Sequence, residues 1–207
     1  MAEAGSTPSA RASAGSQRSS RDAFIDTTGQ LLRRQGYTGT GLNEIVARSG
    51  APKGSLYFHF PGGKEELAVA AMARAGEQLG AAITTILAST EDLGEALGGI
   101  VDALADGLEA SQYRDGCPIA TVTLEAAGGS EPVRDTAAAV FDAWLAALQE
   151  RLVRSGLAPA AARRRALLVL SALEGALILA RAQHDLAPLT AVREELVTLS
   201  RQSSGVV

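Results

Sequence analysis

Apolar residues recur along this chain every three or four positions, which is the repeat of one face of an α-helix. Near the amino end the repeat is carried by Phe24, Ile25, Thr28, Leu31 and Leu32. It predicts a helix over residues 20–35, ended by Gly36. No segment alternates as a half-buried strand does, and Ala and Leu, both strong helix formers, dominate the apolar residues. We therefore predict an all-α protein.

Two short helices are predicted after the first. The second, over residues 42–49, is expected to begin at Thr40 as its N-cap and to end at a turn made by Gly50. The third covers residues 52–60, because a proline is tolerated in the first turn of a helix. Two short helices joined by a glycine turn are typical of a helix-turn-helix, whose second helix enters the major groove of DNA.

The third helix is expected to have two faces. Leu56 and Phe60 stand four residues apart and are expected to enter the core. Lys53 and Tyr57, also four apart, lie on another face, and with His59 they offer hydrogen-bond donors for phosphate oxygens or base edges. The pattern therefore predicts a DNA-facing surface on this helix.

Glycine and proline breaks divide the rest of the chain into six further helices. They are predicted over about residues 64–89, 92–111, 119–127, 132–155, 159–185 and 188–201. Residues 1–19 lack an apolar repeat and are predicted to form a disordered tail, unless Arg11, Arg18 and Arg21 follow the DNA as an arm. The predicted domains are a helix-turn-helix domain over residues 20–66 and a larger helical domain over residues 67–207.

Charge is divided unevenly along the chain. Residues 1–64 carry eight Lys or Arg and four Asp or Glu, a net +4, whereas the remainder carries eleven and nineteen, a net −8. Affinity for nucleic acid follows the local field, so the overall charge of −4 is compatible with a DNA-binding amino end.

Composition argues against several other classes of protein. A single cysteine excludes an internal disulfide and a cysteine-based metal cluster. With two histidines, no nucleophile elbow and no P-loop, we expect no enzymatic activity and no cofactor. Residues 166–180 are interrupted by Ser171, Glu174 and Gly175, so we expect no membrane span and a cytoplasmic protein.

Two functions are predicted for the larger domain. The helix over residues 159–185 is apolar nearly all round, which indicates burial on two sides and, with the final helix, a homodimer contact. A small-molecule cavity is expected between the middle helices, where the scarce aromatic residues gather, although the same residues could form ordinary core. The candidate lining residues are Tyr113, Cys117, Leu124, Phe141, Trp144 and Leu145.

The amino-terminal region resembles the DNA-binding domain of TetR-type repressors. The matching residues are Phe24-Ile25, Leu31-Leu32, Gly36-Tyr37, Thr40, Glu44 to Ala47, Gly50 to Phe60 and Lys64 to Leu67. Thr28-Gly29 departs from the alanines usual in the family, and Pro61-Gly62-Gly63 lengthens the link to Lys64. A second set of residues, Gly116-Cys117-Pro118, Leu124-Glu125, Phe141 and Trp144, resembles the LmrA/YxaF-like branch of that family.

The resemblance implies a homodimer that reads a palindromic double-stranded DNA operator and is released by a small-molecule effector. By position it implies DNA contacts from Thr40, Lys53, Gly54, Tyr57, His59 and Lys64. Around the same helix starts, the predicted set is completed by Gly41, Arg48, Ala51, Pro52 and Ser55. The alternative is a small-molecule-binding or scaffold protein with a vestigial DNA head.

Overall fold

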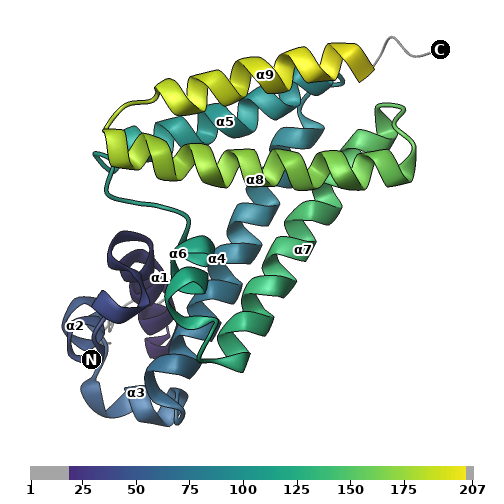
Figure 1. Cartoon of the computed structure of the whole chain (residues 1–207). Coiled ribbons are helices and arrows are strands. Elements are labelled where there is room, and N and C mark those ends of the chain that lie inside the picture. The colour runs from purple at the N-terminus through teal and green to yellow at the C-terminus, as the bar shows by residue number, and fades with distance from the viewer. Residues whose placement is uncertain (1–18, 204–207) are drawn as a thin grey trace, which may run out of the picture.

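The computed structural model describes residues 19–203, and this part of the chain folds into nine α-helices and no strand (Figure 1). In chain order they are α1 (Ser20–Gly39), α2 (Leu42–Ser49), α3 (Lys53–His59), α4 (Gly63–Ala88), α5 (Leu93–Ala110), α6 (Pro118–Ala126), α7 (Glu131–Arg154), α8 (Pro159–Gln183) and α9 (Ala187–Ser203). The predicted all-α fold is confirmed for these residues. Residues 1–18 of the predicted tail, with Arg11 and Arg18, lie outside the described residues, whereas Ser19 caps α1 by accepting a hydrogen bond from Asp22 N–H.

Every predicted helix bound lies within two residues of the observed one, except the end of α1. There the chain kinks at Gly36 (φ 72°, ψ −171°) and then continues for a further turn to Gly39. Gly36 has a conformation that is open only to glycine. The predicted stop at Gly36 is therefore a break in the helix axis and not the last residue of the element.

The predicted roles of two capping residues are wrong. Gly41, not Thr40, is the N-cap of α2, and the Thr40 hydroxyl instead donates back to the carbonyl of Gly36 at 2.6 Å. Pro52 was expected in the first turn of α3 but is its N-cap, with extended backbone.

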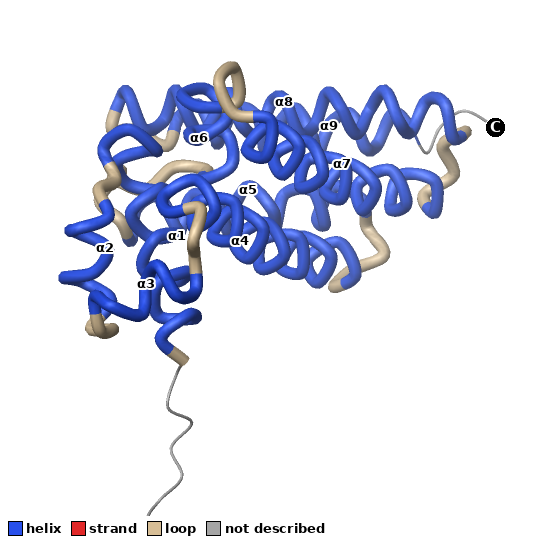
Figure 2. The backbone as a smooth tube through the Cα atoms, turned by 90° about the horizontal axis from the view of Figure 1, so that it is seen from below, coloured by secondary structure: helices blue, strands red, loops and turns tan. Residues whose placement is uncertain are grey.

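The helices form a head at one end of the molecule and a body at the other, joined by two long helices. Helices α1 to α3 gather around the beginning of α4, and α4 runs beside α7 to a layer made of α5, α8 and α9 (Figures 1 and 2). Helix α6 packs between α1 and the long pair. This arrangement lets α4 contact both ends of the molecule.

Two hydrophobic cores follow this division. One consists of residues from α4, α5, α7, α8 and α9. The other combines head residues such as Phe24, Ile45 and Leu56 with α4, α6 and α7, and includes Trp144. The head is therefore packed onto the body through a shared core, and the division at residue 66 stays a prediction about domains.

A buried arginine fixes the junction between α4 and α5. Arg151 of α7 is almost fully buried and donates hydrogen bonds to the carbonyls of Leu87 (3.1 Å), Thr90 (3.2 Å) and Glu91 (2.7 Å). The Leu87 carbonyl at the end of α4 carries partial negative charge, and with the two carbonyls of the following segment it compensates the guanidinium, to which no carboxylate among the described residues is bonded.

Candidate nucleic-acid interface and internal cavity

A left-handed glycine sets the angle between α2 and α3. Gly50 has φ 67° and ψ 3°, and the hydroxyl of Ser49 accepts a hydrogen bond from the Ala51 N–H within the turn. Leu56 is fully buried and holds α3 on the head, and Phe60, just after α3, meets Phe24 edge to face at 6.5 Å between ring centroids. The opposite side of α3 faces solvent as a result.

Three predicted DNA-contacting side chains extend from that solvent side or its edge. Lys53 at the start of α3 is exposed, Tyr57 is 60% exposed, and His59 is half-buried. Gly54 is exposed, and no atom lies within 4 Å of the position a Cβ would take there. The backbone at the beginning of α3 is therefore open to close approach by a ligand.

The remaining predicted residues surround this face, and several already have partners. Arg48 pairs with Glu44 at 3.4 Å, and the ammonium of Lys64 lies 4.4 Å from the ring centroid of Tyr37. The Ser55 hydroxyl donates to the carbonyl of Pro52 at 2.7 Å. Gly41 is exposed and Ala51 is half-buried.

Thr40 and Phe58 differ from the sequence-based expectation. The Thr40 side chain is 1% exposed and both its hydroxyl and its N–H are bonded within the head, so its side chain is not on the predicted surface. Phe58 was not among the predicted residues, yet it is 82% exposed beside Tyr57. A phenylalanine in a short helix gives no sequence signal for exposure, and only the packing of Leu56 and Phe60 reveals it.

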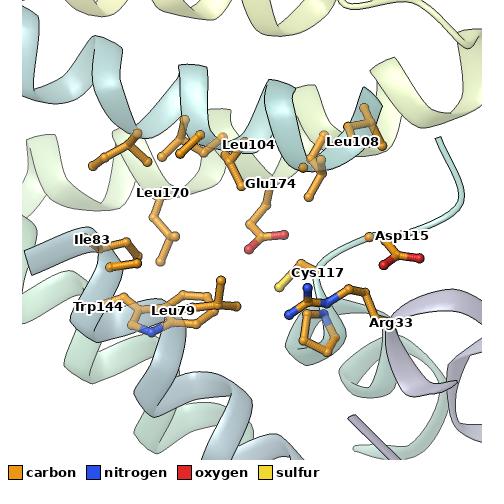
Figure 3. Close-up of a pocket in the computed structure, with 18 of the residues that line it drawn as sticks. Arg33, Leu79, Ile83, Leu104, Leu108, Asp115, Cys117, Trp144, Leu170 and Glu174 are labelled. Atoms are coloured by element: carbon orange, nitrogen blue, oxygen red, sulfur yellow. The ribbon is translucent and has the colours of Figure 1, made fainter. Parts of the chain in front are cut away.

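The body contains a mainly apolar cavity of about 200 Å³ (Figure 3). Helices α4, α5, α7 and α8 supply its apolar walls, and the segment before α6 and the end of α1 close one side. The labelled lining residues in Figure 3 are Arg33, Leu79, Ile83, Leu104, Leu108, Asp115, Cys117, Trp144, Leu170 and Glu174.

Two of the six predicted cavity residues, Cys117 and Trp144, line this cavity. The other four are not among the residues that line it. Leu124 is 80% exposed on α6, and Phe141 packs edge to face on Trp144. Tyr113 stacks near His184, and Leu145 packs against the body core. Rare aromatic residues were a poor guide because most of the lining is aliphatic.

The cavity also contains a carboxylate that the sequence did not single out. Glu174 of α8 points into it, and its Oε2 is buried without a hydrogen-bond partner among the described residues (Figure 3). Burial raises the pKa of Glu174 above its usual range, and burial together with the nearby Glu174 raises the pKa of the Cys117 thiol. A thiol with a raised pKa is mostly protonated at neutral pH and is a poor nucleophile.

Helix α8 has an exposed apolar strip on the side away from the cavity. Leu167, Leu168, Ile178 and Leu179 are each about half exposed, and Gly175 lies between the two pairs with open space above it. Length and hydropathy alone would let α8 cross a membrane, a test that a core helix also passes. Its inner side, however, packs in the body core through Val169, Leu173 and Ala176.

Comparison with known families finds two matches that together cover most of the helices. Residues 24–71 match the family described as bacterial regulatory proteins, tetR family. Residues 94–195 match the family described as transcriptional regulator LmrA/YxaF-like, C-terminal domain.

Individual relatives give the same result. The chain is 35% identical to the transcriptional regulator YxaF of Bacillus subtilis, over 88% of this chain and 96% of that one. It is 32% identical to the regulator LmrA of the same organism, over 82% and 90%. A TetR transcriptional regulator from Legionella pneumophila shares the fold, with a TM-score of 0.80 at 20% identity over 89% of this chain and 98% of that one. These proteins are regulators, in agreement with the prediction that the chain is not an enzyme.

Proposed function

Because this chain belongs to the TetR family of bacterial transcriptional regulators, in its LmrA/YxaF-like branch, we propose that it is a cytoplasmic repressor released from its operator by a small molecule. The operator is palindromic double-stranded DNA, and the protein binds it as a homodimer. The observation that carries the proposal is the combination of an exposed α3 face with an internal cavity, both contacted by α4.

The DNA contacts are assigned to the side of α3 opposite Leu56. Lys53 and the backbone around Gly54 enter the major groove, while Tyr57 and His59 donate to phosphates at its edge. Lys64 reaches a phosphate from the start of α4, where free N–H groups favour an anion. Thr40 takes no direct part through its side chain, because that side chain is buried.

The exposed strip of α8 is assigned to the dimer contact, together with the neighbouring helix α9. A strip of four half-exposed large apolar side chains is unusual for a monomer's surface. The open space at Gly175 allows the same helix of a second copy to approach closely, as a two-fold symmetric contact requires. A dimer of this kind supplies the two α3 helices that a palindrome needs.

The effector is assigned to the cavity, and α4 is the first route from it to the DNA head. Leu79, Ile83 and Ile86 of α4 line the cavity, whereas Leu67 and Met72 of the same helix lie in the head core. A ligand that displaces the middle of α4 therefore changes the position of the head. DNA then lowers the affinity of the protein for the effector, and the effector lowers its affinity for DNA, by the same factor, whichever binds first.

The end of α1 provides a second route. The Gly116 N–H donates to the carbonyl of Arg33 at 3.0 Å, and Asp115 pairs with Arg34 at 3.0 Å. Arg33, Asp115 and Gly116 all line the cavity. A ligand at this side of the cavity therefore contacts residues that are joined to α1 of the head by a hydrogen bond and an ion pair.

The test is a gel shift with duplex DNA from the region upstream of the protein's own gene. A shift with this DNA, absent with a shuffled duplex of the same length, is the expected result. The absence of any shift, even at low salt, would overturn the proposal in favour of a small-molecule-binding or scaffold protein with a vestigial head.

A further inference from the structure

The apolar wall of the cavity is interrupted by one carboxylate from α8. Most of the lining comes from Leu, Ile and Ala side chains of α4, α5 and α8, and the carboxylate of Glu174 enters among them, while Arg33 and Asp115 lie at one side of the cavity. Its Oε2 atom is buried and accepts no hydrogen bond from any of the residues 19–203. A buried carboxylate oxygen without a donor is energetically unfavourable, and such groups are nearly always satisfied in a functional state.

The other ionisable groups of the cavity do not satisfy this oxygen. The Cys117 side chain interacts with Glu174, but a thiol is a weak hydrogen-bond donor. Arg33 and Asp115 lie at the side formed by α1 and the segment before α6, and among the ion pairs of the described residues none joins Arg33 to Glu174. The opposing walls from α4, α5 and α7 contribute only apolar residues and the Trp144 ring, whose N–H is already bonded to the carbonyl of Gly76 at 3.0 Å.

We propose that Glu174 is the specificity-determining residue of this cavity, and that its ligand is a mainly apolar small molecule with one protonated amine that donates to Oε2. The class of ligand is inferred from the cavity alone, and only its role as the effector rests on the proposed function. An ammonium group supplies both the missing donor and the opposite charge, whereas a hydroxyl supplies the donor alone. The aliphatic walls and Trp144 bury the rest of the molecule.

A matched series of probes tests the proposal on the purified full-length protein without DNA. Phenylbutylamine, phenylbutanol, butylbenzene and phenylbutanoate share one apolar body and differ only in the end group. Binding is measured by calorimetry and by the fluorescence of Trp144, the only tryptophan in the sequence. The variant Glu174→Gln keeps the shape of the side chain but removes its charge. The matched control is Glu150→Gln, which removes the charge of an exposed carboxylate on α7.

The expected order of affinity is amine, then alcohol, then hydrocarbon, with the carboxylate weakest. Glu174→Gln should lower the affinity for the amine by on the order of tenfold to a hundredfold, because a hydrogen bond to a charged group is lost. The affinity for butylbenzene should stay unchanged. Glu150→Gln should change nothing. Equal affinities across the series, a preference for phenylbutanoate, no binding of the amine, or an amine affinity unchanged in Glu174→Gln would each overturn the proposal.

The gel shift with upstream DNA separates this proposal from the proposed function. Amine binding that depends on Glu174 but does not weaken the DNA complex would support the specificity of the cavity and contradict its role as the effector site. If the protein without amine gives no shift at all, while its amine selectivity is intact, only the proposed function as a repressor is contradicted.

Discussion

The carboxylate of Glu125 in α6 accepts a hydrogen bond from the backbone N–H of Thr38 at 2.6 Å, 87 residues away in sequence. Thr38 belongs to the extra turn of α1 that follows the kink at Gly36, so a side chain of the body holds an element of the DNA head. The position of a Cβ on Gly36 would lie 1.8 Å from Glu125 Oε1. The lack of a side chain at Gly36 is therefore what lets Glu125 reach Thr38.

We expect the double-mutant cycle of Gly36→Ala and Glu125→Ala to show strong coupling. Gly36→Ala should lower the free energy of unfolding by about 1–3 kcal/mol, because alanine is strained at this φ and ψ, and it also displaces Glu125. With Glu125→Ala already present, the loss should be smaller, since the hydrogen bond to Thr38 is gone. Urea unfolding of the four proteins measures this. Strictly additive effects would contradict the contact.

Arg151→Leu should destabilise the protein by about 2–4 kcal/mol, because the carbonyls of Leu87, Thr90 and Glu91 lose their donor in a partly buried junction. The measurement is the thermal or urea unfolding transition. Arg154→Leu, at an exposed position on the same helix, is the control and should change stability little. Equal effects of the two substitutions would show that the carbonyls find other partners.

Stability should decrease as the pH rises above the ordinary glutamate pKa of 4.5, up to the raised pKa of Glu174. In that range the folded protein holds a proton at Glu174 that the unfolded chain has released, so raising the pH favours unfolding. Glu174→Gln should remove this part of the decrease. Unfolding of both proteins across this pH range measures the difference, and identical pH dependence would contradict the burial of the carboxylate.

Ile178→Arg should convert the proposed dimer to a monomer, because it places a charge within the exposed strip of α8. Sedimentation velocity or light scattering measures the mass. Leu124→Arg is a matched control, since Leu124 is even more exposed but lies on α6. A dimer that survives Ile178→Arg, or dissociates with Leu124→Arg, would place the contact elsewhere.

Local signals in the sequence predicted the helices well. Glycines, prolines and apolar repeats act within a few residues, and the bounds of α2 were predicted without error. The extra turn of α1 was missed because its support comes from Glu125, far away in sequence. A similar reason explains why the predicted N-cap role of Thr40 was wrong. The kink at Gly36 places the carbonyl of Gly36 where the Thr40 hydroxyl donates to it.

The cavity was harder to predict than the exposed side of α3. Lys53 and Tyr57 belong to one short helix, so spacing alone places them together. The cavity collects residues from α1, α4, α5, α7 and α8, and no pattern within one helix shows which of them converge. Glu174 interrupts an apolar helix, and that interruption was the available signal. Within the sequence alone, that interruption argues only against a membrane span.

The central claim is that the exposed side of α3 binds DNA, and the salt dependence of operator affinity in Lys53→Ala tests it most directly. Fluorescence anisotropy with upstream duplex DNA should show weaker binding than wild type, and a slope of log K against log salt that is smaller by about 0.9 if the lysine contacts one phosphate. Arg164→Ala, an exposed basic residue on α8, should leave affinity and slope unchanged. The melting temperature of Lys53→Ala should match that of wild type. An unchanged affinity in Lys53→Ala, or weaker binding together with a large fall in melting temperature, would contradict the account.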